Sequence, residues 1–151
     1  MNNYKIVFMG TPDFGIPSLN ELYKQGYEVE AVYTQPDRVN KRGNKVQFSA
    51  VKQFALEHDI TIYQPNSLKD EKELDVLRAL NPDLIIVIAY GKILPQAVLD
   101  IPKYGVINVH ASLLPKYRGA APVQRSIIDG EETTGVTIMQ LDAGMDTGNI
   151  I

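Results

Sequence analysis

The sequence contains no cysteine and no tryptophan, and it has only two histidines, His58 and His110. The lack of cysteine excludes disulfides, thiolate metal sites and a cysteine nucleophile. Two histidines are too few for a histidine-rich metal site, so we expect no metal. Long apolar runs are also missing, because no segment approaches the roughly 18–20 apolar residues of a membrane span. The run that ends at Gly10 is shorter than a signal-peptide core, and we expect a soluble cytoplasmic protein.

Basic charge is scarce, since 15 lysines and arginines stand against 18 acidic residues and give a net charge of −3. The chain as a whole therefore differs from a basic nucleic-acid binder, although a local basic patch can still exist. Hydrophobic residues make up 44% of the 151 residues, which is enough to fill the core of one ordinary domain. Intrinsic disorder is excluded on the same ground.

Short apolar runs alternate with helix-like stretches along the chain. Strands are expected at residues 4–9, 29–33, 61–63, 84–89, 105–110 and 134–141. Helices are expected at residues 17–26, 49–58, 67–80 and 123–129, and a polar loop at 34–48. The 84–89 run is apolar on both faces, as in a central parallel strand. The alternation predicts an α/β fold, a Rossmann-like, mostly parallel sheet with helices on both faces and ligands at the carboxyl ends of its strands.

Two short motifs resemble nucleotide-binding or protease sequences only in part. The segment Gly10-Thr11-Pro12-Asp13-Phe14-Gly15 lacks the second glycine of a dinucleotide fingerprint, and Ile16-Pro17 replaces the Lys-Ser/Thr of a P-loop. We interpret this turn as structural and expect neither NAD nor ATP. Asp146-Thr147-Gly148 matches the aspartic protease triplet, but those enzymes need two such carboxylates and this chain has one copy.

Asn108 and His110 stand two positions apart in an expected strand, so both side chains point to one face, roughly 6.6 Å apart. An isolated histidine there is more often a hydrogen-bonded core residue than a functional one. Here, however, a proline-rich segment at 111–122 follows, and a glycine-rich segment with carboxylates lies at 142–148. An amide, an imidazole and a carboxylate can then meet without a serine or cysteine nucleophile.

Seven motifs resemble one family. They are Gly10-Thr11-Pro12-Asp13-Phe14, Thr34-Gln35-Pro36-Asp37-Arg38, Ala89-Tyr90-Gly91 with Ile93-Leu94-Pro95, Asn108-Val109-His110-Ala111-Ser112-Leu113-Leu114-Pro115, Arg118-Gly119-Ala120-Ala121-Pro122, Gly135-Val136-Thr137-Ile138-Met139 and Met145-Asp146-Thr147-Gly148. Together they make the chain similar to the methionyl-tRNA formyltransferases over essentially its whole length. The Asn-x-His…Ser-Leu-Leu-Pro pattern is specific to the folate-dependent formyltransferase superfamily. The Gln-Pro-Asp-Arg and Arg-Gly-Ala-Ala-Pro segments narrow the resemblance to the tRNA enzymes.

The resemblance implies transfer of the formyl group of 10-formyltetrahydrofolate to the amino group of methionyl-initiator tRNA, in translation initiation. It also implies that residues 1–151 are an N-terminal formyltransferase catalytic domain that is cut short, without the C-terminal tRNA-binding β-barrel domain of the family. The co-substrate is then a folate, no metal or membrane is needed, and we expect the full-length form to be a monomer.

The resemblance also assigns roles to residues. Asn108 is expected to stabilise the oxyanion, His110 to transfer a proton, and Asp146 to orient or charge-stabilise His110. The folate is expected to lie along Tyr90, Gly91, Ile93, Leu94, Ser112, Leu113, Leu114, Pro115 and Asp142. The tRNA is expected to meet Arg38, Lys41, Arg42 and Lys45. By pattern alone, the leucines are core residues, the basic segment 38–45 is a solvated loop, and His58 is a surface residue at a helix end.

Other readings stay open. The nearest is another folate-dependent formyltransferase, acting on a nucleotide sugar or on glycinamide ribonucleotide, or a 10-formyltetrahydrofolate hydrolase domain. The basic loop and Arg118-Gly119-Ala120-Ala121-Pro122 favour tRNA. A different class is a folate- or RNA-binding module without turnover.

Overall fold

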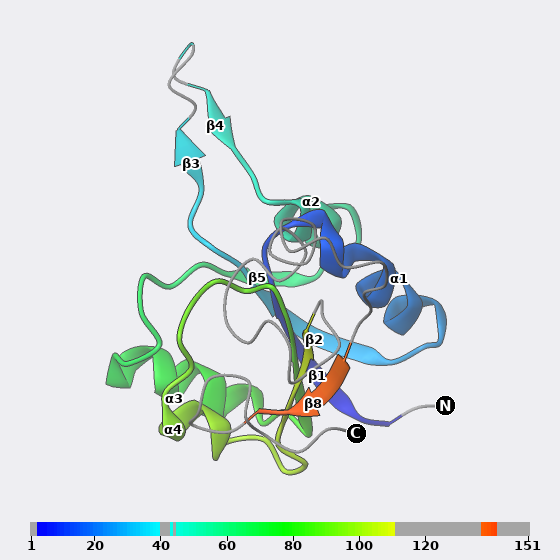
Figure 1. The fold of residues 1–151 in the computed structure, drawn as a ribbon, viewed down its shortest axis with the longest axis vertical. Coiled ribbons are helices and arrows are strands. Elements are labelled where there is room, and N and C mark those ends of the chain that lie inside the picture. Colours follow the sequence, from blue (N-terminus) through cyan, green and yellow to red (C-terminus); the bar gives the residue numbers. More distant parts are fainter. Residues whose placement is uncertain (1–2, 40–42, 44, 111–136, 142–151) are drawn as a thin grey trace, which may run out of the picture.

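A six-stranded sheet in the order β5-β2-β1-β6-β7-β8 forms the centre of the computed structural model (Figure 1). Its strands are β1 (Lys5–Gly10), β2 (Glu28–Tyr33), β5 (Thr61–Tyr63), β6 (Leu84–Ile88), β7 (Val106–His110) and β8 (Thr137–Gln140). Neighbouring strands pair in parallel from β5 to β7, and β8 joins β7 antiparallel. The predicted mostly parallel sheet is confirmed.

The structure describes residues 3–39, 43, 45–110 and 137–141. The expected helix at 123–129 lies outside the described residues. So do Lys41, Arg42 and the two expected site segments at 111–122 and 142–148.

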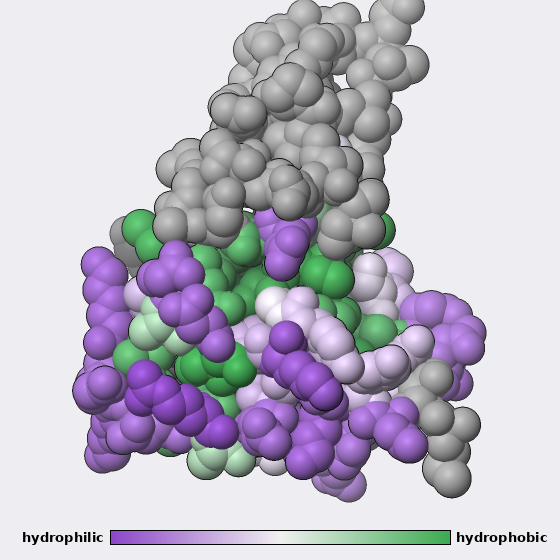
Figure 2. All heavy atoms as spheres, turned by 90° about the horizontal axis from the view of Figure 1, so that it is seen from below, coloured by the Kyte–Doolittle hydropathy of each residue, from purple (hydrophilic) through white to green (hydrophobic). Residues whose placement is uncertain are grey.

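Helices cover both faces of the sheet, as predicted. They are α1 (Ile16–Lys24), α2 (Ala50–Glu57), α3 (Glu71–Leu80) and α4 (Gln96–Leu99), with the 3₁₀ turn η1 (Asp13–Gly15) before α1. Strand β1 shows the division, because Val7 and Met9 pack in the cluster that holds α3 and α4, whereas Phe8 packs in the cluster that holds α1 and α2. Figure 2 shows the lower face, with apolar side chains toward its middle and hydrophilic ones around them.

Local sequence signals explain how α1, α2 and α3 begin. Pro17 occupies the first turn of α1, where its missing N–H costs nothing. Ser49 caps α2 by accepting a hydrogen bond from the Lys52 backbone N–H. The predicted start of α3 at Ser67 is wrong, because Asp70 is the cap and accepts from the Lys72 N–H. Leu68 is buried in the core before the helix begins, and the Asp70 carboxylate suits the positive helix end.

The segment expected as a plain polar loop contains a hairpin. Strands β3 (Arg38–Val39) and β4 (Val46–Gln47) pair antiparallel and project from the body of the molecule (Figure 1). Val39 and Val46 face each other in register and remain 61% and 57% exposed. The four-residue helix α4 is a second element that the pattern did not predict. Elements of two to four residues are too short to show a hydrophobic period.

Candidate active site at the carboxyl edge of the sheet

The centre of the sheet holds a topological switch point. Strands β1 and β6 are neighbours, yet β1 leads to β2 on one side and β6 leads to β7 on the other. In open α/β sheets, ligands bind outside the carboxyl ends of the strands at such a point. Thr11 follows β1 and residues 89–91 follow β6, so these two connections border the expected crevice.

Asn108 and His110 lie at the carboxyl end of β7, next to β6. Val106 belongs to the core cluster under α3 and α4, whereas Val109 packs against the opposite cluster. The strand period therefore places Asn108 and His110 on the α3/α4 side. His110 is buried and pairs in register with Thr137 of β8, and Asn108 is half-buried. The expected position of both side chains on one face of the strand is confirmed. Asp146 lies outside the described residues.

Residues 89–91 form a turn with an unusual backbone. We call it the donor turn, after the formyl donor that the resemblance expects there. Ala89 has φ 52° and Gly91 has φ 84°, both in the left-handed region that non-glycine residues rarely adopt. Beyond the turn, Ile93 is 80% exposed and Leu94 packs partly against the core. Exposed apolar surface is common in ligand sites, and the assignment of Ile93 and Leu94 to the folate stays a prediction.

The Tyr90 side chain points into the core and not toward the crevice. It is 1% exposed, and among the described residues its hydroxyl has no hydrogen-bond partner. Burial raises the pKa of Tyr90 to about 12, with a smaller contribution from Glu73. The resemblance implies that Tyr90 contacts the folate, and only the backbone of Tyr90 is placed to do so from the donor turn.

A largely apolar cavity of about 480 Å³ lies at the switch point on the α1/α2 side. Its lining comes from the turn after β1, from the start of α1 and from the ends of two strands, and consists of Asp13, Phe14, Pro17, Ser18, Ile88 and Val109. Sequence reasoning treated this turn as structural only. The signal that could have found it is Phe14, a large apolar residue in the turn after β1 that stays 42% exposed.

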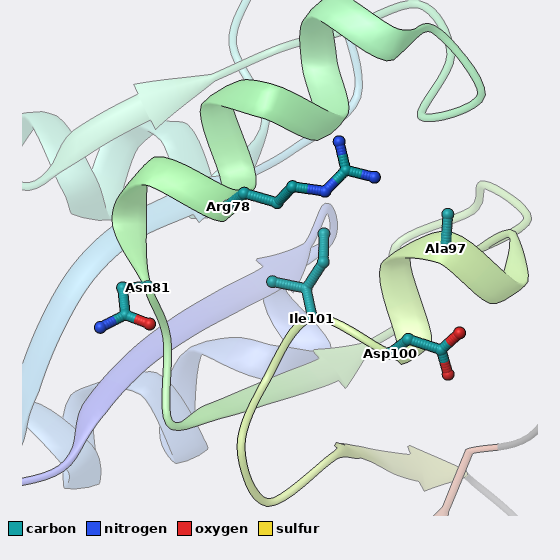
Figure 3. Close-up of a pocket in the computed structure, with 5 residues that line it drawn as sticks. All are labelled: Arg78, Asn81, Ala97, Asp100 and Ile101. Atoms are coloured by element: carbon teal, nitrogen blue, oxygen red, sulfur yellow. The ribbon is translucent and has the colours of Figure 1, made fainter.

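The second cavity, of about 520 Å³, has a different location. It lies between α3 and α4 and is lined by Arg78, Asn81, Ala97, Asp100 and Ile101 (Figure 3). These residues precede β6 and β7 and therefore lie at the amino ends of the strands. The Arg78 guanidinium already pairs with Asp75 at 3.0 Å and Glu71 at 3.5 Å. We assign no function to this cavity.

An ion pair fastens the root of the hairpin. Lys52 Nζ lies 2.7 Å from Asp37 Oδ2 and donates to Gln64 Oε1 at 3.1 Å, and Gln64 Nε2 donates to Asp37 Oδ1 at 2.8 Å. Hydrogen bonds from Lys52 and Gln64 lower the pKa of the Asp37 carboxyl. Arg38 and Lys45 are exposed on this fixed base. Two of the four basic residues assigned to tRNA are thus placed on the projecting hairpin.

His58 ends α2, as predicted from the sequence. Its ring stacks on Phe54 with centroids 3.9 Å apart, and Nδ1 lies 2.8 Å from the Phe54 carbonyl oxygen.

Within the described ranges, no three acidic or histidine side chains gather where a metal ion could bind. The same part of the chain has no helix long and apolar enough to span a membrane.

Residues 4–151 match the family model described as formyl transferase. The chain belongs to the formyl transferase family. The methionyl-tRNA formyltransferase of Clostridium perfringens is 60% identical over 148 residues, and that of Caldanaerobacter subterraneus is 56% identical over 148 residues. Each alignment covers 97% of this chain and 48% of the relative. The chain therefore spans about half the length of these curated formyltransferases.

Solved structures confirm the formyltransferase fold. Glycinamide ribonucleotide transformylase 1 from Symbiobacterium toebii superposes with a TM-score of 0.79 at 19% identity, covering 98% of this chain and 70% of that one. A formyltetrahydrofolate deformylase from Pseudomonas syringae gives a TM-score of 0.74 at 20% identity, covering 100% of this chain and 50% of that one. At such identities the match establishes the fold alone.

Proposed function

We propose that this chain carries the catalytic site of a methionyl-tRNA formyltransferase, which moves the formyl group of 10-formyltetrahydrofolate to the amino group of methionyl-initiator tRNA. The supporting observation is the placement of Asn108 and His110 together at a strand end beside the switch point, in a chain 60% identical to a relative of that name. The proposal includes a role in translation initiation and a cytoplasmic location, and a monomeric full-length form in which a C-terminal domain helps to bind tRNA.

The chemistry needs no protein nucleophile, because the substrate amine attacks the formyl carbon. A carbon–nitrogen bond forms, and the formyl oxygen becomes an oxyanion to which Asn108 Nδ2 donates a hydrogen bond. Removal of one such donor typically costs about 3–4 kcal/mol of transition-state stabilisation. The bond to N10 of the folate then breaks, the amine loses a proton and N10 gains one. His110 carries that proton, and Asp146 orients the imidazole and stabilises its charged form.

In this proposal, the folate lies against the donor turn and the residues beyond it. Tyr90 and Gly91 contribute backbone groups, and Ile93 and Leu94 contribute apolar surface. Ser112, Leu113, Leu114, Pro115 and Asp142 complete the site by resemblance and lie outside the described residues. The partly exposed apolar groups after β6 support this assignment, because ligand sites combine apolar walls with a few polar groups.

A substrate comparison tests the proposed function. The full-length protein is incubated with 10-formyltetrahydrofolate and, separately, with methionyl-initiator tRNA, with glycinamide ribonucleotide, or with water as the only acceptor. We expect formylmethionyl-tRNA and neither of the other products. Formate release without an acceptor would identify a hydrolase, transfer to the ribonucleotide would identify another formyltransferase, and folate binding without any turnover would identify a binding module.

Alanine at both Arg38 and Lys45 is expected to weaken tRNA binding and leave folate binding unchanged. Both side chains are exposed on the projecting hairpin, where they can contact phosphates. The slope of log K against log salt concentration is negative, and each lost phosphate contact reduces its magnitude by about 0.7–0.9. The double variant should therefore reduce the magnitude of the slope by roughly 1–2. Lys72→Ala, an exposed cation on α3, is the matched control. Equal losses for tRNA and folate would contradict a tRNA-specific hairpin.

A further inference from the structure

The backbone conformation of the donor turn needs support from other parts of the chain. Ala89 adopts a left-handed conformation that is sterically unfavourable for an L-residue. Such residues persist only where their surroundings fix them, and they gather at ligand sites. Residues 89–91 therefore need contacts from other parts of the chain to keep this conformation.

Two side chains from the opposite side of the switch point hold it. Thr11 Oγ1 donates to the Tyr90 carbonyl oxygen at 2.9 Å, and Gln35 Nε2 donates to the Gly91 carbonyl oxygen at 2.8 Å. The Gln35 backbone N–H donates to Thr11 Oγ1 at 3.3 Å, so the two anchors are also joined to each other. A Cβ at Gly91 would lie 2.8 Å from Gln35 Nε2, which shows how closely the amide approaches the turn.

Gln35 is in turn fixed from behind. Its carbonyl oxygen accepts a hydrogen bond from Gln64 Nε2 at 3.2 Å, and the same Gln64 amide donates to Asp37 Oδ1 at the hairpin root. The Gln35 backbone is therefore held at both its N–H and its carbonyl group, and its side-chain amide donates to the Gly91 carbonyl oxygen. Neither Thr11 nor Gln35 has a role in the chemistry proposed above, although both lie in motifs that the sequence shares with the family.

We propose that Gln35 and Thr11 are positioning residues for the formyl donor. They hold the carbonyls of Tyr90 and Gly91, and through them the backbone that faces the folate, in the geometry that binds the pterin ring. This proposal rests on the proposed function. Neither residue touches the reacting atoms, so their loss affects binding of the donor more than the transfer step.

Gln35→Ala in the full-length protein is expected to raise the KM for 10-formyltetrahydrofolate about tenfold, the typical effect of one lost hydrogen bond of about 1.4 kcal/mol. We expect kcat and the KM for tRNA to change by less than about threefold. Thr11→Val removes the hydroxyl at constant shape and should raise the donor KM similarly, whereas Thr11→Ser keeps the hydroxyl and should restore it. Gln25→Ala is the matched control, because its amide bonds Glu21 on the surface of α1, away from the donor turn.

The outcomes are separable. If the wild-type protein neither binds folate nor transfers formyl groups, the proposed function fails whatever the variants do. If the wild-type protein is active and Gln35→Ala keeps its donor KM, or loses kcat alone, the positioning role is overturned. If Gln35→Ala does not fold, the comparison of Thr11→Val with Thr11→Ser tests the proposal. Equal KM values for 10-formyltetrahydrofolate in these two variants would overturn it.

Discussion

Alanine at Asn108 or His110 in the full-length protein is expected to lower kcat for formyl transfer by about 100- to 1,000-fold. The folate Kd should change by less than about threefold. Asn108 acts on an oxyanion that exists only after attack on the formyl carbon, so its loss leaves ground-state binding intact. His110 acts on a proton that moves in the same step. Both side chains lie on the α3/α4 side of β7, where they can reach one reacting centre.

Single-turnover kinetics and equilibrium folate binding, measured on the same samples, separate the two quantities. His58→Ala is the control for His110, because His58 stacks on Phe54 at the end of α2 and has no role in the proposed chemistry. Asn20→Ala on α1 is the control for Asn108. Near-normal turnover in both site variants, or a rise in folate Kd as large as the fall in kcat, would show that the assigned chemistry is wrong.

The sheet could be predicted because each strand has its own local signal. The apolar run at 84–89 shows its burial on both faces without any other part of the chain, and the structure confirms it as β6 beside the central strand. Asn108 and His110 could be selected for the same reason, since a period of two needs only neighbouring residues. The hairpin, α4 and the true start of α3 were missed, because their signals are two to four residues long or depend on the burial of Leu68.

The anchors of the donor turn could not be predicted, because their partners are far away in sequence. Gln35 and Gly91 are 56 positions apart, and Thr11 and Tyr90 are 79 apart. No local pattern shows that a glutamine amide will meet a carbonyl at that separation. The resemblance includes Thr11 and Gln35 in its motifs without assigning either residue a role. Only the sheet order, which places β1 between β2 and β6, brings the three loops together.

Gly10 lies where β1 and β6 meet, and the structure leaves no room for a side chain at this position. It ends β1 and pairs in register with Ile88 of β6. A Cβ at this position would lie 2.7 Å from the Ile88 carbonyl oxygen and 2.8 Å from a carbon of the Phe8 ring. The first contact is with the backbone of a central strand, which cannot turn away as a side chain can. A methyl group would therefore have to push β1 and β6 apart at their carboxyl ends.

Gly10→Ala is expected to lower the free energy of unfolding by about 2–3 kcal/mol, the upper range for overpacking in a core. Gly15→Ala is a close control, because the described atoms nearest to its Cβ belong to the side chains of Phe8 and Ile88, at 3.1 Å and 3.3 Å, and it should cost less than about 1 kcal/mol. Urea unfolding followed by circular dichroism measures both. Thr11 follows Gly10 directly, so the strand separation should also weaken its bond to Tyr90 and raise the donor KM. Equal free energies of unfolding for the two variants would show that β1 and β6 can separate at little cost. The hydrogen bond from Thr11 to the donor turn would then not depend on close packing at Gly10.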